Sequence, residues 1–444
     1  MNYLIETYGC QMNTAESASF LLVLKERGWV QARNKEDADL VLINTCSVRA
    51  TAERRVRGRI AQYEALKRKR PFTLIIAGCM ASRLGDTLKT DYKAVDYVMG
   101  TASRPLFPHI LEALEGGIPF VEDTEKPAFS FAPFHLEDGR FCSFIPITHG
   151  CDNFCSYCVV PYVRGPEISR DPAAIFAEIR LVAEKGAREI MLLGQNVNSY
   201  YWDGGSVGKN LDFPRLLEAV AAEIEKTPIR WIRFLSSHPK DLSTRVIRVM
   251  ADRPAFCRHL HLCAQHGSNA ILRAMNRRYS REQYLELVDE IRGAMPDITF
   301  STDMLIGFPG EMKEDHAQTL DLMERVRFLY AYMYHYNPRE GTPAFEMPGR
   351  IGQGLKRKRL GEVIALQKQH TLELLQNRVG SRETVLVEGV SRRNAEELLT
   401  RTERDERVVV PGKRCMIGSF AELTLESLWG NTFRAKELSL CPGD

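Results

Sequence analysis

The sequence lacks any apolar run of the roughly 20 residues that a membrane span needs, which excludes a transmembrane helix. Its first residues, MNYLIETYGC, contain neither a basic-then-apolar signal segment nor an Arg- and Ser-rich transit peptide, so we expect a cytoplasmic protein. The net charge is also small, at +3, and by itself does not indicate a nucleic-acid binder. A hydrophobic content of 44% and a charged content of 26% exclude a disordered chain.

Cysteine, in contrast, is abundant for a reduced compartment. The chain has 11 cysteines in 444 residues, and an odd number argues against a set of paired disulfides. In a large intracellular protein, clustered thiols favour metal binding or catalysis. The length predicts about three domains, which we place at residues 1–118, 137–370 and 374–440.

The first domain alternates short apolar strands with helical stretches, a pattern typical of βαβ units and a parallel sheet. We predict strands at Tyr3–Thr7, Leu40–Ile43, Thr73–Ala77 and Val95–Met99, with helices near 14–28 and 48–69. Residues 116–138 are rich in Pro, Phe and acidic residues without a clear period, and we interpret them as a linker.

The alternation of strands and helices resumes from about 141 to 336. Six units fall short of the eight of a closed (βα)8 barrel, so we predict a partial (βα)6 barrel with its active site at the carboxyl ends of the strands. The predicted strands are Ser143–Thr148, Glu189–Leu193, Ile229–Leu235, His259–Leu262, Ile298–Leu305 and Ala331–Tyr336, and helices include 171–185 and 281–294.

After a long basic helix, near 355–378, the chain becomes β-rich over residues 381–440, which predicts a small five-stranded β-barrel of a kind that often binds RNA. From residue 377 onward it has 11 Lys and Arg and 11 Asp and Glu, so RNA binding there would need a one-sided patch. Basic runs at 54–59, 67–70 and 356–359 have the composition of phosphate contacts or, equally, of solvated helix faces.

Cys151, Cys155 and Cys158 form a C-x3-C-x2-C pattern directly after the first barrel strand. Thiolates at this spacing can hold three irons of a [4Fe-4S] cluster and leave the fourth iron open to chelate S-adenosylmethionine. The alternative is a structural zinc site, but such sites more often use paired C-x2-C units that supply four ligands. We therefore predict a radical S-adenosylmethionine enzyme.

Cys10, Cys46 and Cys79 are far apart in sequence, yet each follows a predicted strand by one to three residues. Because the carboxyl ends of parallel strands meet at one edge of a sheet, these thiols should converge. Three unrelated buried cysteines, the alternative, would not share this placement. We predict a second, auxiliary cluster, again with one open iron.

The chain resembles the methylthiotransferase family of radical S-adenosylmethionine enzymes over nearly its whole length. The motifs that carry the resemblance are YGCQMN at 8–13, NTCSVR at 44–49, GCMA at 78–81, CDNFCSYCVVPYVRG at 151–165, GQNVNSY at 194–200, SSHP at 236–239 and TDMLIGFPGE at 302–311. The C-terminal segment resembles the family's RNA-binding TRAM domain. YVRG and QNVNSY resemble most closely the tRNA branch of the family, called MiaB.

This resemblance implies 2-methylthiolation of N6-(dimethylallyl)adenosine, the nucleotide just 3′ of the anticodon of certain tRNAs. It implies two [4Fe-4S] clusters, held by the two cysteine trios, and two S-adenosylmethionine molecules per turnover. The expected partners are the tRNA anticodon stem-loop and a low-potential electron donor such as flavodoxin or ferredoxin. We expect a monomer, and the sequence does not indicate a sulfur donor.

The predicted contacts to S-adenosylmethionine are Tyr157, which lies between two cluster ligands, and four residues at strand ends, Gln195, Asn196, Ser237 and Asp303. For each, an ordinary turn or strand-end polar residue is an equal alternative.

Two departures from the family pattern stand out. Cys263 and His266 occupy a segment where Pro-Val-Gln-Ser is usual, and we expect both to face the cavity near a strand end. Glu340 replaces a usual proline in a turn.

Three other functions are alternatives. Two share the chemistry, methylthiolation of the threonylcarbamoyl-modified tRNA base or of an aspartate in a ribosomal protein, and the QNVNSY and YVRG motifs disfavour both. The third is a non-catalytic, metal-bearing RNA-binding protein.

Overall fold

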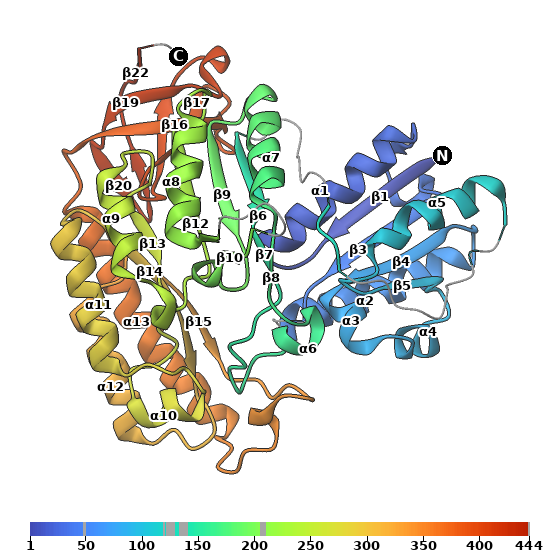
Figure 1. Cartoon of the computed structure of the whole chain (residues 1–444), viewed down its shortest axis with the longest axis horizontal. Coiled ribbons are helices and arrows are strands. Elements are labelled where there is room, and N and C mark those ends of the chain that lie inside the picture. The colour runs from blue at the N-terminus through green and yellow to red at the C-terminus, as the bar shows by residue number, and fades with distance from the viewer. Residues whose placement is uncertain (48–49, 119, 121–128, 133–140, 205–209, 443–444) are drawn as a thin grey trace.

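The chain folds into an N-terminal α/β region, a central barrel and a C-terminal β-rich region, as a computed structural model shows (Figure 1). The structure describes residues 1–47, 50–118, 120, 129–132, 141–204 and 210–442. The predicted α/β fold class is confirmed, and most of the predicted linker lies outside the described residues. Within the described ranges, no helix is long and apolar enough to cross a membrane.

The N-terminal region is a five-stranded sheet in which all neighbouring strands run parallel. The strands are hydrogen-bonded in the order β2 (Val30–Gln31), β1 (Asn2–Thr7), β3 (Leu40–Thr45), β4 (Thr73–Gly78) and β5 (Tyr97–Met99). The edge strand β2 was not predicted, because two residues are too short to show any alternation of apolar side chains.

Helices cover both faces of this sheet, and successive residues of the buried strand β3 point to opposite sides. Leu40 and Leu42 pack with α1 (Gln11–Glu26) and α5 (Phe107–Gly116). Val41 and Ile43 pack on the other side with residues of α2 (Ala50–Lys67), α3 (Cys79–Leu84) and α4 (Thr87–Asp91). This double cover is typical of parallel sheets, whose strands read as continuous apolar runs.

The central region has the six parallel strands that the sequence predicts: β6 (Cys142–Pro146), β9 (Glu189–Leu193), β12 (Trp231–Phe234), β13 (His259–His261), β14 (Thr299–Ile306) and β15 (Tyr330–His335). They form two sheets, with β9 between β6 and β12 and with β14 between β13 and β15. Parallel bridges from Ile232 to Phe256 and from Ser237 to Leu262 connect the two sheets between β12 and β13.

Helices follow the strands and bury a large apolar core against them. They are α6 (Val160–Arg164), α7 (Pro172–Glu184), α8 (Phe213–Ile224), α9 (Thr244–Asp252), α10 (Asn269–Ala274), α11 (Arg281–Ala294), α12 (Lys313–Val326) and α13 (Gln353–Gln376). Two short antiparallel strand pairs accompany them, β7 (Thr148–His149) with β8 (Ile168–Ser169), and β10 (Tyr201–Trp202) with β11 (Leu211–Asp212).

The C-terminal region has seven strands in one sheet rather than the five predicted, which corrects the prediction. Their order is β20 (Ser427–Trp429), β21 (Thr432–Arg434), β18 (Arg407–Pro411), β17 (Glu397–Thr402), β16 (Arg382–Val390), β19 (Phe420–Thr424) and β22 (Ser439–Leu440). The last three strands in the sequence, β20 to β22, have only two or three residues each. Runs this short carry no readable period.

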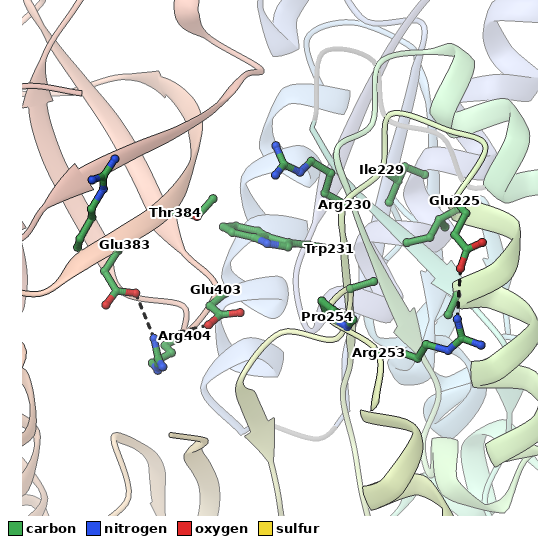
Figure 2. A pocket seen from close by; sticks show the side chains of 14 residues that line it. Glu225, Ile229, Arg230, Trp231, Arg253, Pro254, Glu383, Thr384, Glu403 and Arg404 are labelled. Carbon is green, nitrogen blue, oxygen red and sulfur yellow. Dashed lines mark hydrogen bonds and ion pairs between the residues drawn. The ribbon is translucent and has the colours of Figure 1, made fainter. Parts of the chain in front are cut away.

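This sheet docks on the amino ends of the barrel strands, opposite the ends that bear the predicted site. Arg188, just before β9, donates to the Gly418 carbonyl at 2.8 Å, and Arg233 of β12 donates to the Glu403 carbonyl at 2.7 Å. A groove of about 690 Å³ lies between the two regions. Figure 2 shows Trp231 and Arg230 on one side of it and Glu383 and Arg404 on the other.

A buried carboxylate holds this interface together. Glu189, fully buried, lies 3.2 Å from Arg233 and 3.0 Å from Arg401 of the C-terminal sheet. Burial by itself would raise the pKa of Glu189, but the two guanidinium groups outweigh it and hold the pKa below its usual value. The carboxylate is therefore ionised in the folded protein.

Glu189→Ala should lower the free energy of unfolding by about 3–5 kcal/mol, because it leaves the buried Arg233 without its carboxylate partner and removes the most buried of the carboxylates that pair with Arg401. Urea unfolding followed by circular dichroism measures this loss. The matched control is Glu225→Ala: Glu225 and its partner Arg253 are 64% and 46% exposed, so their pair should contribute about 0–1 kcal/mol. Equal losses in the two variants would contradict a stabilising role for the Glu189 contacts.

Candidate functional site

Both cysteine trios line one cavity of about 280 Å³ between the N-terminal region and the carboxyl ends of the barrel strands. The N-terminal side contributes Cys10, Cys46 and Cys79, and the barrel contributes Cys151, Cys155 and Cys158. Helix α1 packs its first turn against the barrel, where Met12 and Ala15 contact Leu193. The two sets of thiols, separated by more than seventy residues at their closest in the chain, therefore face a shared space.

The loop that carries Cys151, Cys155 and Cys158 is held by its backbone. Gly150 has φ +78°, and a Cβ there would lie 1.9 Å from the Pro166 carbonyl oxygen, so only glycine fits before Cys151. The Ser156 amide donates to the Met275 carbonyl at 3.0 Å. These contacts fix the loop between the barrel and the segment after α10.

A buried arginine contacts one thiol of this trio directly. Arg277 Nη1 lies 3.4 Å from Cys155 Sγ, and its Nη2 donates to the Cys263 carbonyl at 2.8 Å. Burial lowers the pKa of Arg277, but neighbouring Tyr279, Tyr157 and Cys155 outweigh this and keep it raised. A permanent positive charge therefore lies beside the trio, and it opposes the effect of burial on the pKa of Cys158. Sequence reasoning missed Arg277, since no local motif marks it.

Burial also governs the protonation of the thiols. It raises the pKa of Cys151 to about 11, and that of Cys158 and Cys79 to about 12. These groups are neutral thiols at physiological pH unless a metal replaces their protons. The donor set is thus of the kind that suits soft metal ions and not a set of surface nucleophiles.

The other trio occupies the strand-end positions expected from the sequence. Cys46 follows β3 directly, Cys79 is the first residue of α3 after β4, and Cys10 precedes α1. Gly9 has φ +147°, and a Cβ at this position would lie 2.7 Å from Cys46 Cβ and 2.4 Å from Asn13 Oδ1. The close approach that brings Cys10 beside Cys46 therefore depends on the absence of a side chain at position 9.

The buried side-chain amides of Asn13 and Asn44 lie next to this trio and hydrogen-bond to each other's residues. Cys10 Sγ lies 3.4 Å from Asn13 Oδ1, and Asn13 Nδ2 donates to Asn44 Oδ1 at 3.0 Å. Asn44 Nδ2 in turn donates to the Asn13 carbonyl at 2.9 Å. Both asparagines belong to the motifs around Cys10 and Cys46, and motif position is the signal that would have identified them.

One ion pair joins the two halves of the cavity. Arg164 of α6, six residues after Cys158, lies 2.7 Å from Glu16 of α1, and both side chains are buried. Arg164 also lines the cavity. The loop after one trio is therefore tied to the helix that begins at the other.

Four of the five predicted S-adenosylmethionine contacts line the cavity: Tyr157, Gln195, Ser237 and Asp303. The fifth, Asn196, is not among the lining residues, and its amide donates to Asp241 Oδ2 at 2.7 Å. Gln195 Oε1 and Ser237 Oγ are buried without a hydrogen-bond partner in the described part of the chain. Buried polar atoms of this kind are normally satisfied, so these point to a polar ligand or to water in the cavity.

His238 is a further polar group on the same wall that sequence reasoning did not select. Burial lowers its pKa to about 2, so the ring is neutral. Its Nδ1 accepts from the Lys240 amide at 3.4 Å, which leaves the proton on Nε2, a buried atom with no partner among the described residues. The cavity wall thus offers a hydrogen-bond donor without a partner, His238 Nε2–H, as well as acceptors without partners, Gln195 Oε1 and Ser237 Oγ.

Two family models match the chain, "Uncharacterized protein family UPF0004" over residues 2–100 and "Radical SAM superfamily" over 145–323. A relative from Treponema pallidum (strain Nichols) is 48% identical, with 98% of each chain covered. One from Treponema denticola is 46% identical, with 98% of this chain and 99% of the relative covered. Both are named tRNA-2-methylthio-N(6)-dimethylallyladenosine synthase.

The chain belongs to the methylthiotransferase family of radical S-adenosylmethionine enzymes. Among solved structures, it is similar to the radical S-adenosylmethionine methyltransferase TsrM from Kitasatospora setae, with a TM-score of 0.58 and 15% identity over 78% of this chain and 74% of that one. The cobalamin-dependent radical enzyme OxsB gives a TM-score of 0.52 at 10% identity, over 83% of this chain and 56% of that one. These two similarities concern the fold alone.

The departures from the methylthiotransferase pattern differ in their placement. Cys263 lines the cavity as expected. His266 does not, which corrects the expectation: its ring is buried 3.3 Å from Glu311 and within hydrogen-bond distance of Thr319. Glu340 lies exposed in a turn after β15.

Several residues of the basic runs pair within the fold. Arg59, Lys67 and Arg70 form ion pairs with Glu6, Asp96 and Asp39. Lys356 is buried and donates to the Tyr336 carbonyl at 2.8 Å, and Arg359 pairs with Glu311 at 2.8 Å. These members of the runs stabilise the fold and are not free for phosphate.

Proposed function

We propose that this methylthiotransferase adds a methylthio group to C2 of N6-(dimethylallyl)adenosine, just 3′ of the anticodon in tRNA. The observation that carries the proposal is the shared cavity, in which two cysteine trios on different domains face one another. The names of the relatives, at 46–48% identity over nearly the full length, support the same substrate.

The residues present fit two iron–sulfur clusters and S-adenosylmethionine. Each trio is composed of buried or half-buried thiols, and the wall between them carries the unpartnered polar atoms of Gln195, Ser237 and His238. When bound, the clusters and S-adenosylmethionine supply one-electron chemistry that activates an unreactive C–H bond, together with the sulfur and methyl groups to be transferred. Two S-adenosylmethionine molecules per turnover would match a product that gains a methyl group and loses a hydrogen.

The chain's own residues prepare these sites. Cys151, Cys155 and Cys158 would bind the cluster that works with S-adenosylmethionine, and Arg277 offers a hydrogen bond to Cys155 at 3.4 Å. Cys10, Cys46 and Cys79 would bind the auxiliary cluster. Gln195, Ser237 and the Nε2–H of His238 would orient the polar groups of S-adenosylmethionine, and the apolar side chains of Met12, Leu193 and Leu235 exclude water.

Two exposed aromatic residues lie on the loop that carries Cys151, Cys155 and Cys158 and on the helix that follows it, and they would stack on an unpaired base of the tRNA. Phe154, between two thiols of its trio, is 48% exposed, and Tyr162 of α6 is 53% exposed, with the two ring centroids 6.2 Å apart. Single-stranded loops of RNA are commonly bound by stacking of their bases on such rings. The C-terminal sheet lies at the other end of the barrel, so it would contact a more distant part of the tRNA.

The nucleosides of tRNA from a strain that lacks this gene test the proposal. We expect 2-methylthio-N6-(dimethylallyl)adenosine to disappear and its unthiolated precursor to accumulate, and the wild-type gene should restore the product. Mass spectrometry of the digested tRNA measures both. If the level of 2-methylthio-N6-(dimethylallyl)adenosine stayed unchanged, and the methylthio form of threonylcarbamoyladenosine or of a ribosomal aspartate disappeared instead, that second molecule would be the substrate.

The metal content separates these enzymes from a non-catalytic RNA-binding protein. Protein purified and reconstituted without oxygen should contain about eight irons and as many sulfides per chain, the content of two four-iron clusters. Zinc without sulfide would exclude all the methylthiotransferase functions.

A further inference from the structure

Three metal-binding side chains meet where β13 ends beside the neighbouring strand β14, outside both cysteine trios. His261 is the last residue of β13, Cys263 follows it by two residues, and Asp303 lies on the neighbouring strand β14. Cys263 Sγ lies 3.3 Å from His261 Nε2 and 3.5 Å from Asp303 Oδ2, and the imidazole and the carboxylate are 3.4 Å apart. One sulfur, one nitrogen and one oxygen donor thus form a nearly equilateral triangle.

This triangle has the size of one face of a zinc coordination tetrahedron. With Zn–S near 2.3 Å and Zn–N and Zn–O near 2.0–2.1 Å, tetrahedral angles separate the donors by about 3.3–3.6 Å. The three observed distances, 3.3, 3.4 and 3.5 Å, lie within that range. An ion would therefore bind with little movement of the side chains.

Neighbouring groups orient the donors. Ser301 Oγ lies 3.0 Å from His261 Nδ1, which leaves Nε2 to face Cys263 and Asp303. Histidines that bind metals commonly engage their second nitrogen in this way. The backbone of Cys263 is held by Arg277 and by the hydroxyl of Tyr279, which donate to its carbonyl at 2.8 and 3.2 Å.

The open side of the triangle faces the cavity. His261 is 8% exposed, whereas Cys263 and Asp303 are only partly buried and line the cavity together with the radical trio (Cys151, Cys155 and Cys158). Three protein donors with a fourth position open to a cavity is the arrangement of catalytic zinc sites, whereas structural sites are closed by four protein ligands.

We propose that His261, Cys263 and Asp303 bind a divalent transition-metal ion of the zinc class, with one coordination position open to the active-site cavity. The site goes beyond the proposed function and uses none of the six cysteines assigned to clusters. The open position suits a water, an anion or a soft sulfur ligand within the cavity. Asp303 then binds the ion in place of the S-adenosylmethionine contact predicted for it.

Zinc binding to the reconstituted holoenzyme tests the proposal. After incubation with ZnCl₂ and gel filtration, we expect elemental mass spectrometry to find about one zinc per chain. The X-ray absorption spectrum at the zinc edge should show one sulfur near 2.3 Å and nitrogen or oxygen neighbours near 2.0–2.1 Å. This spectrum does not detect the iron of the clusters, so it reports on bound zinc alone.

Matched variants decide the outcome. Cys263→Ala and the isosteric Asp303→Asn should each retain at least about tenfold less zinc while iron and sulfide stay unchanged, since even loss of a group behind a metal ligand costs about 10–100-fold in affinity. Cys415→Ala, at an exposed cysteine in the C-terminal region, should retain zinc like the wild type. Wild-type zinc no higher than in Cys263→Ala and Asp303→Asn, or a zinc spectrum with only sulfur neighbours, would overturn the site.

Discussion

Cys155→Ala should abolish both reductive cleavage of S-adenosylmethionine and formation of the methylthio nucleoside, whereas Cys46→Ala should abolish only the second. Each loss should exceed about 100-fold, since even loss of a partner behind a metal ligand costs 10–100-fold. The two thiols face one cavity but belong to different trios, on the barrel and on the N-terminal sheet. The variants therefore separate generation of the radical from insertion of sulfur.

The measurements are 5′-deoxyadenosine and methylthio nucleoside from the same reaction, with iron and sulfide counted for each variant. Each should keep about four irons, those of the remaining cluster. Cys415→Ala, which removes an exposed thiol far from the cavity in sequence and in the fold, should leave both products at wild-type levels. Repeated turnover to the methylthio product by Cys46→Ala would disprove the role of the auxiliary trio.

Much of the architecture could be predicted, because buried parallel strands are long and apolar on both faces. The six barrel strands begin and end within two residues of their predicted bounds, although β6 stops at Pro146 and the separate strand β7 starts at Thr148. The short strands β2, β20, β21 and β22 were missed, since two or three residues do not show a period. Domain boundaries stay predictions, and much of the expected linker is outside the described residues.

The sequence predicts those site residues whose positions depend only on where a strand ends. Cys10, Cys46 and Cys79 converge because parallel strands end at one edge, and that rule required no knowledge of side chains. Whether a strand-end residue faces the cavity depends on the rotation of the loop, which the sequence does not show. Gln195 faces it, whereas Asn196, its neighbour, pairs with Asp241.

Long-range partners were beyond sequence reasoning altogether. Arg277 reaches Cys155 from more than a hundred residues away, and Arg164 reaches Glu16 from a different domain. His261, Cys263 and Asp303 come together only because β13 and β14 are neighbours in register. Contacts of this kind are properties of packing, and a single sequence carries no pattern for them.

Among these partners, Arg164 has the strongest argument for a role in the reaction. Its Nη1 pairs with Glu16 at 2.7 Å, whereas its Nη2 is buried without a hydrogen-bond partner among the described residues. Burial lowers its pKa, but neighbouring Cys79 and Glu16 outweigh burial and keep the pKa raised. The guanidinium therefore places a fixed positive charge against the auxiliary thiols, although it belongs to the loop after the radical trio.

A positive charge at this position should favour the reduced form of an auxiliary cluster, because reduction adds negative charge in a poorly solvated site. Arg164 is thus a positioning residue that sets the electrostatics of one trio from the loop of the other. A purely structural role is the alternative, since the buried Glu16 also needs a counter-charge.

Arg164→Met should therefore lower the reduction potential of the auxiliary cluster and reduce methylthiolation by about 10–100-fold, the usual effect of losing a group behind metal ligands. The potential is best measured by electron paramagnetic resonance in the Cys155→Ala background, where only the auxiliary cluster remains. The double variant Glu16→Met/Arg164→Met removes the unpaired carboxylate and should recover stability, because buried ion pairs can be replaced by apolar side chains at little cost. If that double variant also recovered the wild-type potential and the methylthio product, Arg164 would act only as the partner of Glu16.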